Sequence, residues 1–306
     1  MRSQSGCQLE LLSIGVKSSV NQKAGIVITT RNREQDLSKL FSLLQEQPAW
    51  HQYPIWVHDD ASDRVSENYW QQVKKHATLI RNPRRTGYIV NRNISNASVP
   101  FDFIFSLDDD SCFVDPDGPD LAVKYLEAHP KVAALSFPLV DSFNPPPLKD
   151  TSPYPCLSYV GCAHLIRKDV FIQLGGYRSD FIHQCEEPEL CSRIWAAGYE
   201  VYAFPACRVH HWVSPESRNY RRMGFYGARN RVWSHILHTP ISLLPLEIAR
   251  AFGSYMKFSL KTKMPLVHLS GLASGIQQGL FNLSDRQALS ISLYNYLTSL
   301  PVSAKK

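Results

Sequence analysis

The apolar run from Phe103 to Leu107 ends directly in three adjacent aspartates, Asp108, Asp109 and Asp110. The run has the composition of a buried strand, and such a strand would deliver all three carboxylates to its C-terminal end. Like charges so close together raise one another's pKa values, and a divalent cation with oxygen ligands and a bound phosphate relieves the repulsion. Acidic residues also begin solvated loops and cap the segments that follow. These three residues alone therefore leave both interpretations open.

Strand-like and helix-like segments alternate through the first half of the chain, which is typical of an α/β sheet. The expected strands are 25–30, 54–58, 78–80, 102–107 and 132–138, and the expected helices are 34–47, 66–76, 91–97 and 119–128. A proline-rich boundary at 144–155 precedes a strand at 158–166, a turn at Gly175 and Gly176, a helix at 188–197 and a strand at 200–204. Beyond His211 the pattern is mainly helical and rich in arginine.

Polar clusters follow three of the expected strands, at 29–33, 58–62 and 108–110. The ligand crevice of an open parallel sheet lies beyond the C-terminal strand ends, so these clusters would converge on one edge. Each cluster singly could merely cap the next helix, but the three together favour a binding site. The chain has neither GxGxxG after the first strand nor GxxxxGK[ST], which argues against a dinucleotide site and a P-loop.

Two glutamates, Glu186 and Glu187, precede Pro188, a residue that suits the first turn of a helix and places Glu187 near the N-cap. Acids there complement the helix dipole, so structure alone would explain them. A carboxylate held at a helix start also stays ionised near neutral pH, as a general base requires. The buried face of this helix is expected at Leu190, Ile194 and Ala197.

Paired histidines, His210 and His211, follow the expected strand 200–204. They are either core or surface residues, or one of them joins the carboxylates as a nitrogen ligand or contacts a diphosphate. A zinc site is disfavoured, because the spacing of its candidate ligands matches no structural zinc pattern. Those candidates are Cys185, Cys191, Cys207 and His210.

The net charge of +6 hides an asymmetry: residues 1–207 carry 20 Lys+Arg against 24 Asp+Glu, whereas residues 208–306 carry 13 against 3. A basic third of this kind suits an anionic membrane surface, a diphosphate or a lipid-linked acceptor. Nucleic acid is disfavoured as a partner, because the region lacks a recognisable nucleic-acid-binding motif.

The cysteines and the apolar segments indicate the compartment. Seven cysteines with no CxxC pair argue against a disulfide framework. The N-terminus does not resemble a secretory signal, and no apolar run is long enough to span a bilayer. We therefore expect a reduced, cytoplasmic protein, either free or peripheral on the inner face of the plasma membrane.

The segment 241–263 is expected to be a helix with an apolar face and a basic face. Such a helix could lie on an anionic membrane, or its apolar face could pack on the rest of the protein. The apolar residues are Leu243, Leu244, Ile248, Phe252 and Tyr255, and the basic ones are Arg250, Lys257, Lys261 and Lys263. Before it, Arg218, Arg222 and Arg229 recur at near-helical spacing and form either a solvated face or a cover over a diphosphate.

The ordered set of motifs resembles the family 2 glycosyltransferases over about residues 24–235. Residues 26–33 look like the opening strand of that family, and 59–62 like its second-strand acidic motif. Arg92-Asn93 and 107–110 are similar to the Arg-Asn pair and the metal-binding DxD element. Residues 175–177, Glu186-Glu187 and Tyr226 with Arg229-Asn230 resemble the acceptor-side elements.

The resemblance implies a GT-A fold, with a Rossmann-like mixed sheet flanked by helices and a helical C-terminal extension. It implies an N-terminal extension at 1–23, a catalytic domain at 24–238 made of a nucleotide-sugar half (24–140) and an acceptor half (141–238), and a helical region at 239–306. The activity would be inverting transfer from a nucleotide-diphosphate sugar to a hydroxyl of a glycan or lipid-linked acceptor, in cell-surface polysaccharide synthesis.

The resemblance also implies roles for single residues. Glu187 would be the general base, with Glu186 beside it. Mg²⁺ or Mn²⁺ would be held by Asp108, Asp110, His210 and His211. The donor would contact Thr30, Arg31, Asn32, Arg33, Asp59, Asp60, Arg92, Asn93, Asp108, Asp109 and Arg229.

Two departures keep a second interpretation open. The family's acidic pair is usually Glu-Asp, whereas this chain has Glu186-Glu187, and three aspartates stand where two would suffice. The alternative is a non-catalytic nucleotide-sugar-binding or scaffold subunit of a polysaccharide assembly. A nucleotidyltransferase is the nearest enzymatic rival.

Overall fold

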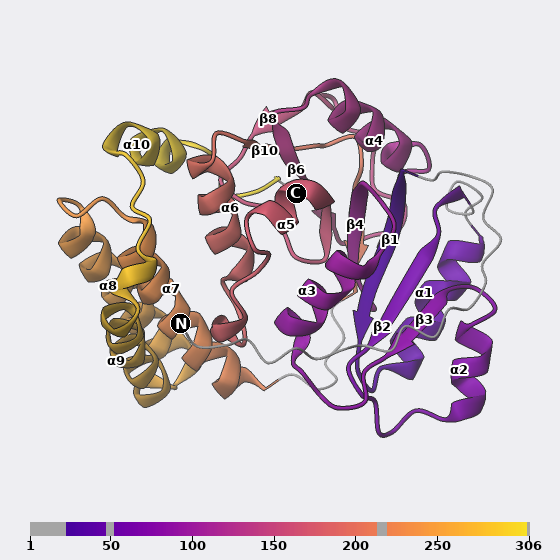
Figure 1. The fold of residues 1–306 in the computed structure, drawn as a ribbon, viewed down its shortest axis with the longest axis horizontal. Coiled ribbons are helices and arrows are strands. Elements are labelled where there is room, and N and C mark those ends of the chain that lie inside the picture. Colours follow the sequence, from indigo (N-terminus) through magenta and orange to yellow (C-terminus); the bar gives the residue numbers. More distant parts are fainter. Residues whose placement is uncertain (1–22, 47–51, 213–218, 305–306) are drawn as a thin grey trace.

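The computed structural model describes residues 23–46, 52–212 and 219–304. An eight-stranded sheet with helices on both faces organises these residues (Figure 1). The strand order is β3(Thr78–Arg81), β2(Ile55–Asp59), β1(Ala24–Thr30), β4(Phe103–Asp108), β9(Ala163–Arg167), β6(Val132–Ser136), β10(Glu200–Ala203) and β8(Tyr154–Pro155). The expected α/β class is thus confirmed, while most of the expected N-terminal extension lies outside the described residues.

The sheet is mixed because β9 runs antiparallel to its neighbours β4 and β6, whereas β3, β2, β1 and β4 are parallel. Register brings the polar strand ends together: Thr30 lies opposite Asp59, and Thr29 lies opposite Asp108. The sequence clusters at 29–33, 58–62 and 108–110 therefore do meet at one edge of the sheet.

A small second sheet lies next to that edge, in the order β5(Ser111–Phe113), β11(Val209–His211) and β7(Leu139–Val140). It pairs His211 with Ser111 and His210 with Cys112. This sheet fixes the histidine pair beside the three aspartates, in a strand rather than after one.

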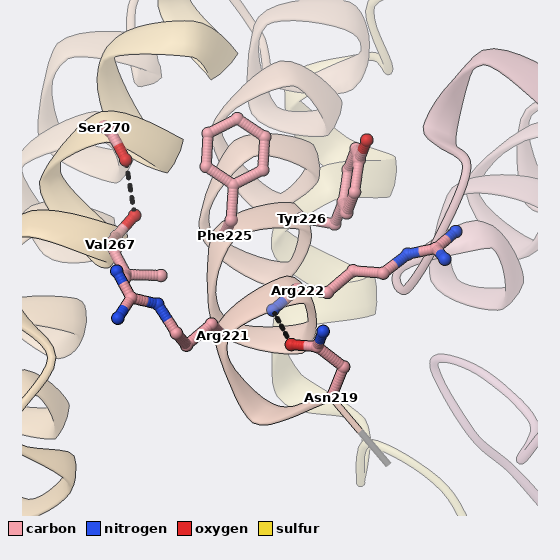
Figure 2. Close-up of a pocket in the computed structure, with 7 residues that line it drawn as sticks. All are labelled: Asn219, Arg221, Arg222, Phe225, Tyr226, Val267 and Ser270. Carbon is pink, nitrogen blue, oxygen red and sulfur yellow. Dashed lines mark hydrogen bonds between the residues drawn. The ribbon is translucent and has the colours of Figure 1, made fainter. Parts of the chain in front are cut away.

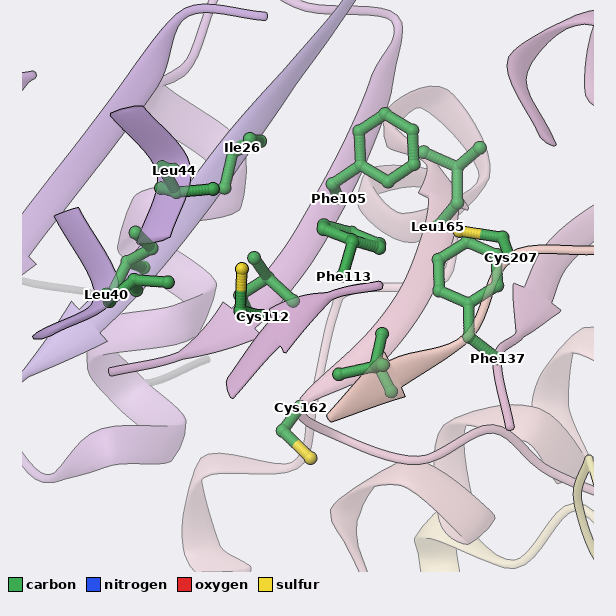
Figure 3. Packing of buried hydrophobic residues seen from close by; sticks show 14 of the residues in the cluster. Ile26, Leu40, Leu44, Phe105, Cys112, Phe113, Phe137, Cys162, Leu165 and Cys207 are labelled. Carbon is green, nitrogen blue, oxygen red and sulfur yellow. The ribbon is translucent and has the colours of Figure 1, made fainter. Parts of the chain in front are cut away.

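Alternating side chains of the central strands fill two cores, one on each face of the sheet. Ile26 and Phe105 point into the first core, with α1(Glu34–Gln45), α2(Glu67–Val73) and α4(Gly118–Ala128). Figure 3 shows this packing, in which the Phe113 ring lies 5.5 Å from that of Phe105. Val27 and Ile104 point into the second core, with α3(Tyr88–Ser98), α5(Lys168–Gln173), α6(Glu186–Ala196) and α7(Tyr220–His238).

The C-terminal helices form a layer beside α6 (Figure 1). They are α7, α8(Leu244–Thr262), α9(Pro265–Phe281) and α10(Ile291–Ser299). Glycines let α9 approach α7 closely: a Cβ added at Gly271 would lie 2.4 Å from the Phe225 carbonyl oxygen, and one at Gly275 would lie 2.3 Å from that of Arg229. None of the helices in the described residues is long and apolar enough to cross a bilayer.

Most of the apolar face expected on α8 packs inside the molecule. Leu244, Ile248, Phe252 and Tyr255 contact a small core built around Ala228 of α7 and Leu272 of α9. Of the two alternatives for this face, packing on the rest of the protein is the one observed. On α6, Leu190 and Ile194 are buried as expected, but Ala197 is exposed because the helix ends at Ala196.

Candidate active site

A cleft of about 960 Å³ opens at the polar edge of the sheet. Its walls come from the ends of β1 and β4, from α3, from the segment 158–162 and from the start of α6. Ten of the residues expected at the site line it: Thr30, Arg31, Arg33, Asp60, Arg92, Asp108, Asp109, Glu186, Glu187 and His211.

On the β1 side of the cleft, Arg33 neutralises part of the aspartate cluster. Its guanidinium lies 2.9 Å from Asp109 and 2.7 Å from Asp110. Thr30 Oγ1 donates a hydrogen bond of 2.7 Å to Asp109. Burial nevertheless raises the pKa of Asp109 to about 8, because desolvation outweighs the favourable charge of Arg33. Through its contacts with Thr30 and Arg33, Asp109 therefore has a structural role as well as being a source of negative charge.

Across the cleft, Arg92 joins the aspartates to the glutamate pair. Its guanidinium lies 2.5 Å from Asp108, 3.5 Å from Glu186 and 3.4 Å from Glu187. It also lies over the Tyr88 ring at 5.1 Å from the ring centroid. The buried Arg92 guanidinium thus partly balances the charge of one aspartate and of both glutamates.

The position of Glu187 at a helix start suggested that its carboxyl group stays ionised near neutral pH, but its surroundings raise its pKa instead. Burial raises its pKa to about 8, and the like charge of Glu186 adds to the rise while Arg92 opposes it. Burial raises the pKa of Glu186 as well. The dipole of α6 acts at the same position, yet desolvation has the larger effect. A carboxyl group with a pKa near the working pH is well matched to proton transfer.

The space for Glu187 depends on a glycine. A Cβ added at Gly161 would lie 2.1 Å from Glu187 Oε1 and 3.1 Å from Arg92 Nη1. The absence of a side chain at Gly161 therefore lets Glu187 and Arg92 lie side by side at the cleft wall.

The loop before α6 has an unusual backbone. Ile182, Gln184 and Cys185 all have φ values between 64° and 71°, a left-handed conformation that costs free energy in residues other than glycine. The buried Asn230 amide holds this loop, since its Nδ2 lies 2.9 Å from the Phe181 carbonyl oxygen, 2.7 Å from that of His183 and 2.8 Å from that of Gln184. Helix α7 thus holds in place the loop that leads into α6, the helix on which Glu186 and Glu187 lie.

Six residues expected at the site do not line the cleft, and each has another role. Asn93 bonds to the backbone of Tyr177, and Arg229 to the carbonyl oxygen of Asp180. Asn32 binds Asp63, and Asp59 accepts from Ser62 and Arg81. His210 bonds to the Val140 carbonyl oxygen, and the buried Asp110 carboxylate lies 2.7 Å from Arg33 and 3.1 Å from His211. Their motifs are in place, but these side chains are directed into the framework.

The two histidines are therefore distinguished by the structure. Neighbouring residues of a strand point to opposite faces. His210 packs against Phe143, with ring centroids 4.1 Å apart, whereas His211 Nε2 lies 3.1 Å from Asp110 Oδ1. Of this pair, only His211 faces the carboxylates.

Cys162 is the site residue that the sequence did not reveal. Ligand atoms of Asp108, Cys162 and His211 all lie within 4.8 Å of one another. The oxygen, nitrogen and sulfur atoms make a donor set suited to a divalent transition metal. A lone cysteine in an apolar segment carries no sequence signal for such a role. Its neighbour in space, His211, is 49 positions away along the chain.

Comparisons with known proteins agree with this architecture. The family model described as glycosyl transferase family 2 matches residues 25–175. An uncharacterized glycosyltransferase of Haemophilus influenzae is 26% identical over 113 residues, which span 37% of this chain and 37% of that protein.

Solved structures share the fold at low identity. A mannosyltransferase from Pyrobaculum calidifontis in complex with GDP-Man and Mn²⁺ has a TM-score of 0.57 and 17% identity, covering 90% of this chain and 79% of that one. GalNAc-T7 with UDP, GalNAc and Mn²⁺ has a TM-score of 0.55 and 17% identity, covering 80% of this chain and 58% of that one. The expected GT-A fold is thus confirmed.

Proposed function

Because residues 25–175 belong to glycosyl transferase family 2, we propose that this protein transfers a sugar from a nucleotide-diphosphate sugar to an acceptor hydroxyl, with inversion at the anomeric carbon. The observation that carries the proposal is the single cleft in which Arg92 connects Asp108 with Glu187. A donor-side carboxylate and a candidate base face each other there.

The donor is proposed to bind along the ends of β1 and β4. Thr30, Arg31, Arg33 and Asp60 line this part of the cleft and would meet the nucleotide. Asp60 is already oriented, since its carboxylate accepts hydrogen bonds from the Thr86 and Gly87 backbone N–H groups. Asn32, Asp59, Asn93 and Arg229 are assigned to support of this wall and of the loop before α6.

Mg²⁺ or Mn²⁺ is proposed as the cofactor. Asp108 and His211 would hold the ion, with Asp110 orienting His211 through its hydrogen bond. Burial keeps the pKa of the Cys162 thiol well above its usual value, and a neutral thiol is a poor ligand for either ion, so Cys162 would lie beside the ion without binding it. A divalent cation supplies charge neutralisation for the departing nucleoside diphosphate. Its involvement is supported by the donor set and by the Mn²⁺ in the structures with the same fold.

Glu187 is proposed as the general base. The acceptor oxygen would form a bond to the anomeric carbon as the bond from that carbon to the diphosphate oxygen breaks, and the hydroxyl proton would pass to Glu187. One displacement inverts the anomeric carbon and needs no covalent intermediate. Arg92 stabilises the ionised form of Glu187, so loss of that arginine would leave the base protonated over a wider pH range.

The acceptor is proposed to be a glycan or a lipid-linked hydroxyl in cell-surface polysaccharide synthesis. The basic C-terminal third favours contact with anionic material, and we propose peripheral membrane association at the cytoplasmic face rather than nucleic-acid binding.

A panel of nucleotide sugars, with release of nucleoside diphosphate measured with and without Mn²⁺, tests the activity. We expect one donor class to be turned over and the rate to fall when a chelator is added. Glu187→Gln is the matched control. Release of inorganic diphosphate instead would indicate a nucleotidyltransferase. Binding of a donor without any turnover would support the non-catalytic alternative.

A further inference from the structure

We propose that the outer face of α9, together with the basic turn between α8 and α9, docks on an anionic membrane and brings a lipid-borne acceptor to the cleft. The nature of the acceptor rests on the proposed function. The docking deepens the peripheral membrane association proposed above by assigning it to the surface of these two helices.

The charge pattern of this region is one-sided. From residue 248 to residue 284 the chain has no aspartate or glutamate, but it has Lys257, Lys261 and Lys263, together with Arg250, which is paired with Glu247. Helix α9 carries no Asp, Glu, Lys or Arg at all. An uncharged helix beside a basic turn is the composition expected of a segment that lies at the surface of an anionic bilayer.

The apolar residues of α9 divide between two faces. The glycine face packs against α7 so closely that added side chains would collide with its backbone. On the outer face Leu266, Leu269, Ala273 and Leu280 recur at helical spacing, and we call them the α9 stripe. Leu266 is 80% exposed and Leu280 is 58% exposed. The close α7 contact fixes the rotation of α9, so within the described residues the stripe faces solvent.

Further apolar side chains extend this surface at both ends of α9. Leu260, in the last turn of α8, is 82% exposed, and Phe281 is 75% exposed. Lys261 and Lys263 lie beside Leu260 in the turn. Exposed leucines alternating with lysines suit the headgroup boundary, where apolar side chains enter and ammonium groups meet lipid phosphates. A protein partner of matching charge would need its own acidic rim, whereas an anionic bilayer supplies both features.

A hollow of about 610 Å³ lies next to this surface. It lies between α7 and α9 and is lined by Asn219, Arg221, Arg222, Phe225, Tyr226, Val267 and Ser270. Figure 2 shows Arg221 extending toward Val267 of α9 while Arg222 leaves α7 on the opposite side. None of the described residues that line it carries a carboxylate, and Arg222 Nε has no hydrogen-bond partner in the described part of the chain.

Arg222 links the two spaces. Arg222 and Asn219 line both the hollow and the cleft. Burial together with the charges of Arg222 and Arg92 lowers the pKa of His183 to about 4, which places the Arg222 charge near the cleft wall at His183. A lipid phosphate beside Arg221 would therefore leave the attached sugar directed past Arg222 into the cleft that contains Glu187.

Co-sedimentation of the full chain with vesicles tests the docking. We expect binding to phosphatidylcholine vesicles that contain phosphatidylglycerol, weaker binding as salt rises, and little binding to phosphatidylcholine alone. Leu266→Asp with Leu280→Asp should weaken binding by about a hundredfold or more, since each leucine withdrawn from water contributes about tenfold or more. Leu121→Asp on α4, also an exposed leucine, is the matched control and should bind normally.

The basic residues are tested separately. Arg221→Ala should weaken vesicle binding about fivefold, the effect of one basic residue near an anionic surface. Inorganic diphosphate serves as a soluble competitor in the same assay. If diphosphate binds Arg221 tightly in solution while vesicles do not bind, the ligand is a free phosphate and the membrane proposal is wrong.

Two further results would overturn the docking. One is equal binding of the Leu266→Asp, Leu280→Asp variant and the parent chain. The other is a stable dimer that the same variant abolishes, since a second copy would then cover the stripe. Circular dichroism checks that the variant is folded, and single Leu266→Asp replaces it if the pair is not. Donor hydrolysis without lipid should be unchanged in these variants, so failure of the docking is distinguishable from failure of the proposed function.

Discussion

At the scale of single residues, the proposed chemistry depends on the ion pairs that the carboxylates of the site form with two arginines, Arg33 and Arg92. The sequence indicated that Glu187 is a base, but its ionisation was predicted wrongly. A helix start favours the charged form, and the sequence could not show that α3 and the segment 158–162 would close over the side chain. The burial of a side chain depends on elements that are far away along the chain, whereas a sequence motif gives information only about adjacent residues.

The pKa of Glu187 predicts how activity varies with pH. Because the folded-state pKa is near 8, the fraction of ionised base and the rate of transfer should rise as pH increases through about 8. Glu187→Gln should lower kcat by about 10²–10⁴-fold and abolish this rise, while donor KM changes little. The measurement is kcat and KM between pH 6 and pH 9, with Glu67→Gln as a control for an exposed glutamate.

The same group makes an opposite prediction for stability. Its pKa is raised on folding, so the folded state holds a proton that the unfolded state has lost, and stability falls as pH rises from the unfolded value of 4.5 through about 8. Glu187→Gln, which resembles the protonated form, should raise the melting temperature at pH 8 more than at pH 5. An equal shift at both values would contradict the raised pKa.

The adjacent histidines give a prediction with a built-in control. His211→Ala should weaken Mn²⁺ binding at least about tenfold, because its ring faces Asp110 and lies with Asp108 and Cys162. His210→Ala should bind Mn²⁺ normally, since His210 bonds to the Val140 carbonyl oxygen. Titration followed by the paramagnetic signal of free Mn²⁺ measures both. Comparable losses in the two variants would reject the assignment of His211.

At the scale of elements, long periodic segments were predicted well and short ones were missed. Strand β1 and helix α1 differ from the expected ranges by one or two residues. A continuous apolar run specifies the strand, and apolar residues at helical spacing specify the helix. Strands β5, β7 and β11 have two or three residues each, too few for any period to be seen. They form only because the large sheet brings their backbones together, yet they hold the histidine pair at the site.

The contact between α7 and the loop before α6 leads to a prediction at this scale. Asn230→Ala removes the amide whose Nδ2 lies within 2.9 Å of three carbonyl oxygens, and loss of such a buried hydrogen-bond donor costs about 1–3 kcal/mol. Because the loop positions Glu187, kcat should fall more than donor KM changes. The test compares both constants and the melting temperature with those of Asn295→Ala, a change at an exposed asparagine on α10. A loss of stability with unchanged kcat would mean that Asn230 is only structural.

At the scale of the whole molecule, the residues that follow α10 pack against the wall of the candidate active site. The resemblance places the chemistry between residues 24 and 238, yet the last described residues cross back to the acceptor half. The Leu157 N–H donates to the Pro301 carbonyl oxygen at 2.9 Å, and the Ser158 N–H donates to that of Val302 at 2.8 Å. No pattern in a five-residue segment predicts such a long-range pairing, which exists only after both halves have folded.

Because of this pairing, the residues after α10, which we call the C-terminal tail, form part of the cleft wall. Val302 and Ser303 line it on the same wall as Ser158, Tyr159 and Gly161, the segment that gives Glu187 its space. The segment 157–162 is thus held from both sides, by the strand β9 that follows it and by the tail. A chain ending at Ser299 should therefore melt at a lower temperature and should transfer sugar more slowly.

The expected loss falls on acceptor-dependent transfer more than on donor binding, since the nucleotide is proposed to lie along the ends of strands β1 and β4. Donor affinity of the shortened chain, measured by calorimetry, should remain within a few-fold of the full chain, while kcat with acceptor falls at least about tenfold, as for other losses of catalytic positioning. Val302→Ala keeps the backbone hydrogen bonds and should preserve both quantities. Equal losses in the truncation and in Val302→Ala would assign the effect to the valine side chain, and an unaltered kcat after truncation would show that the tail covers the cleft without shaping it.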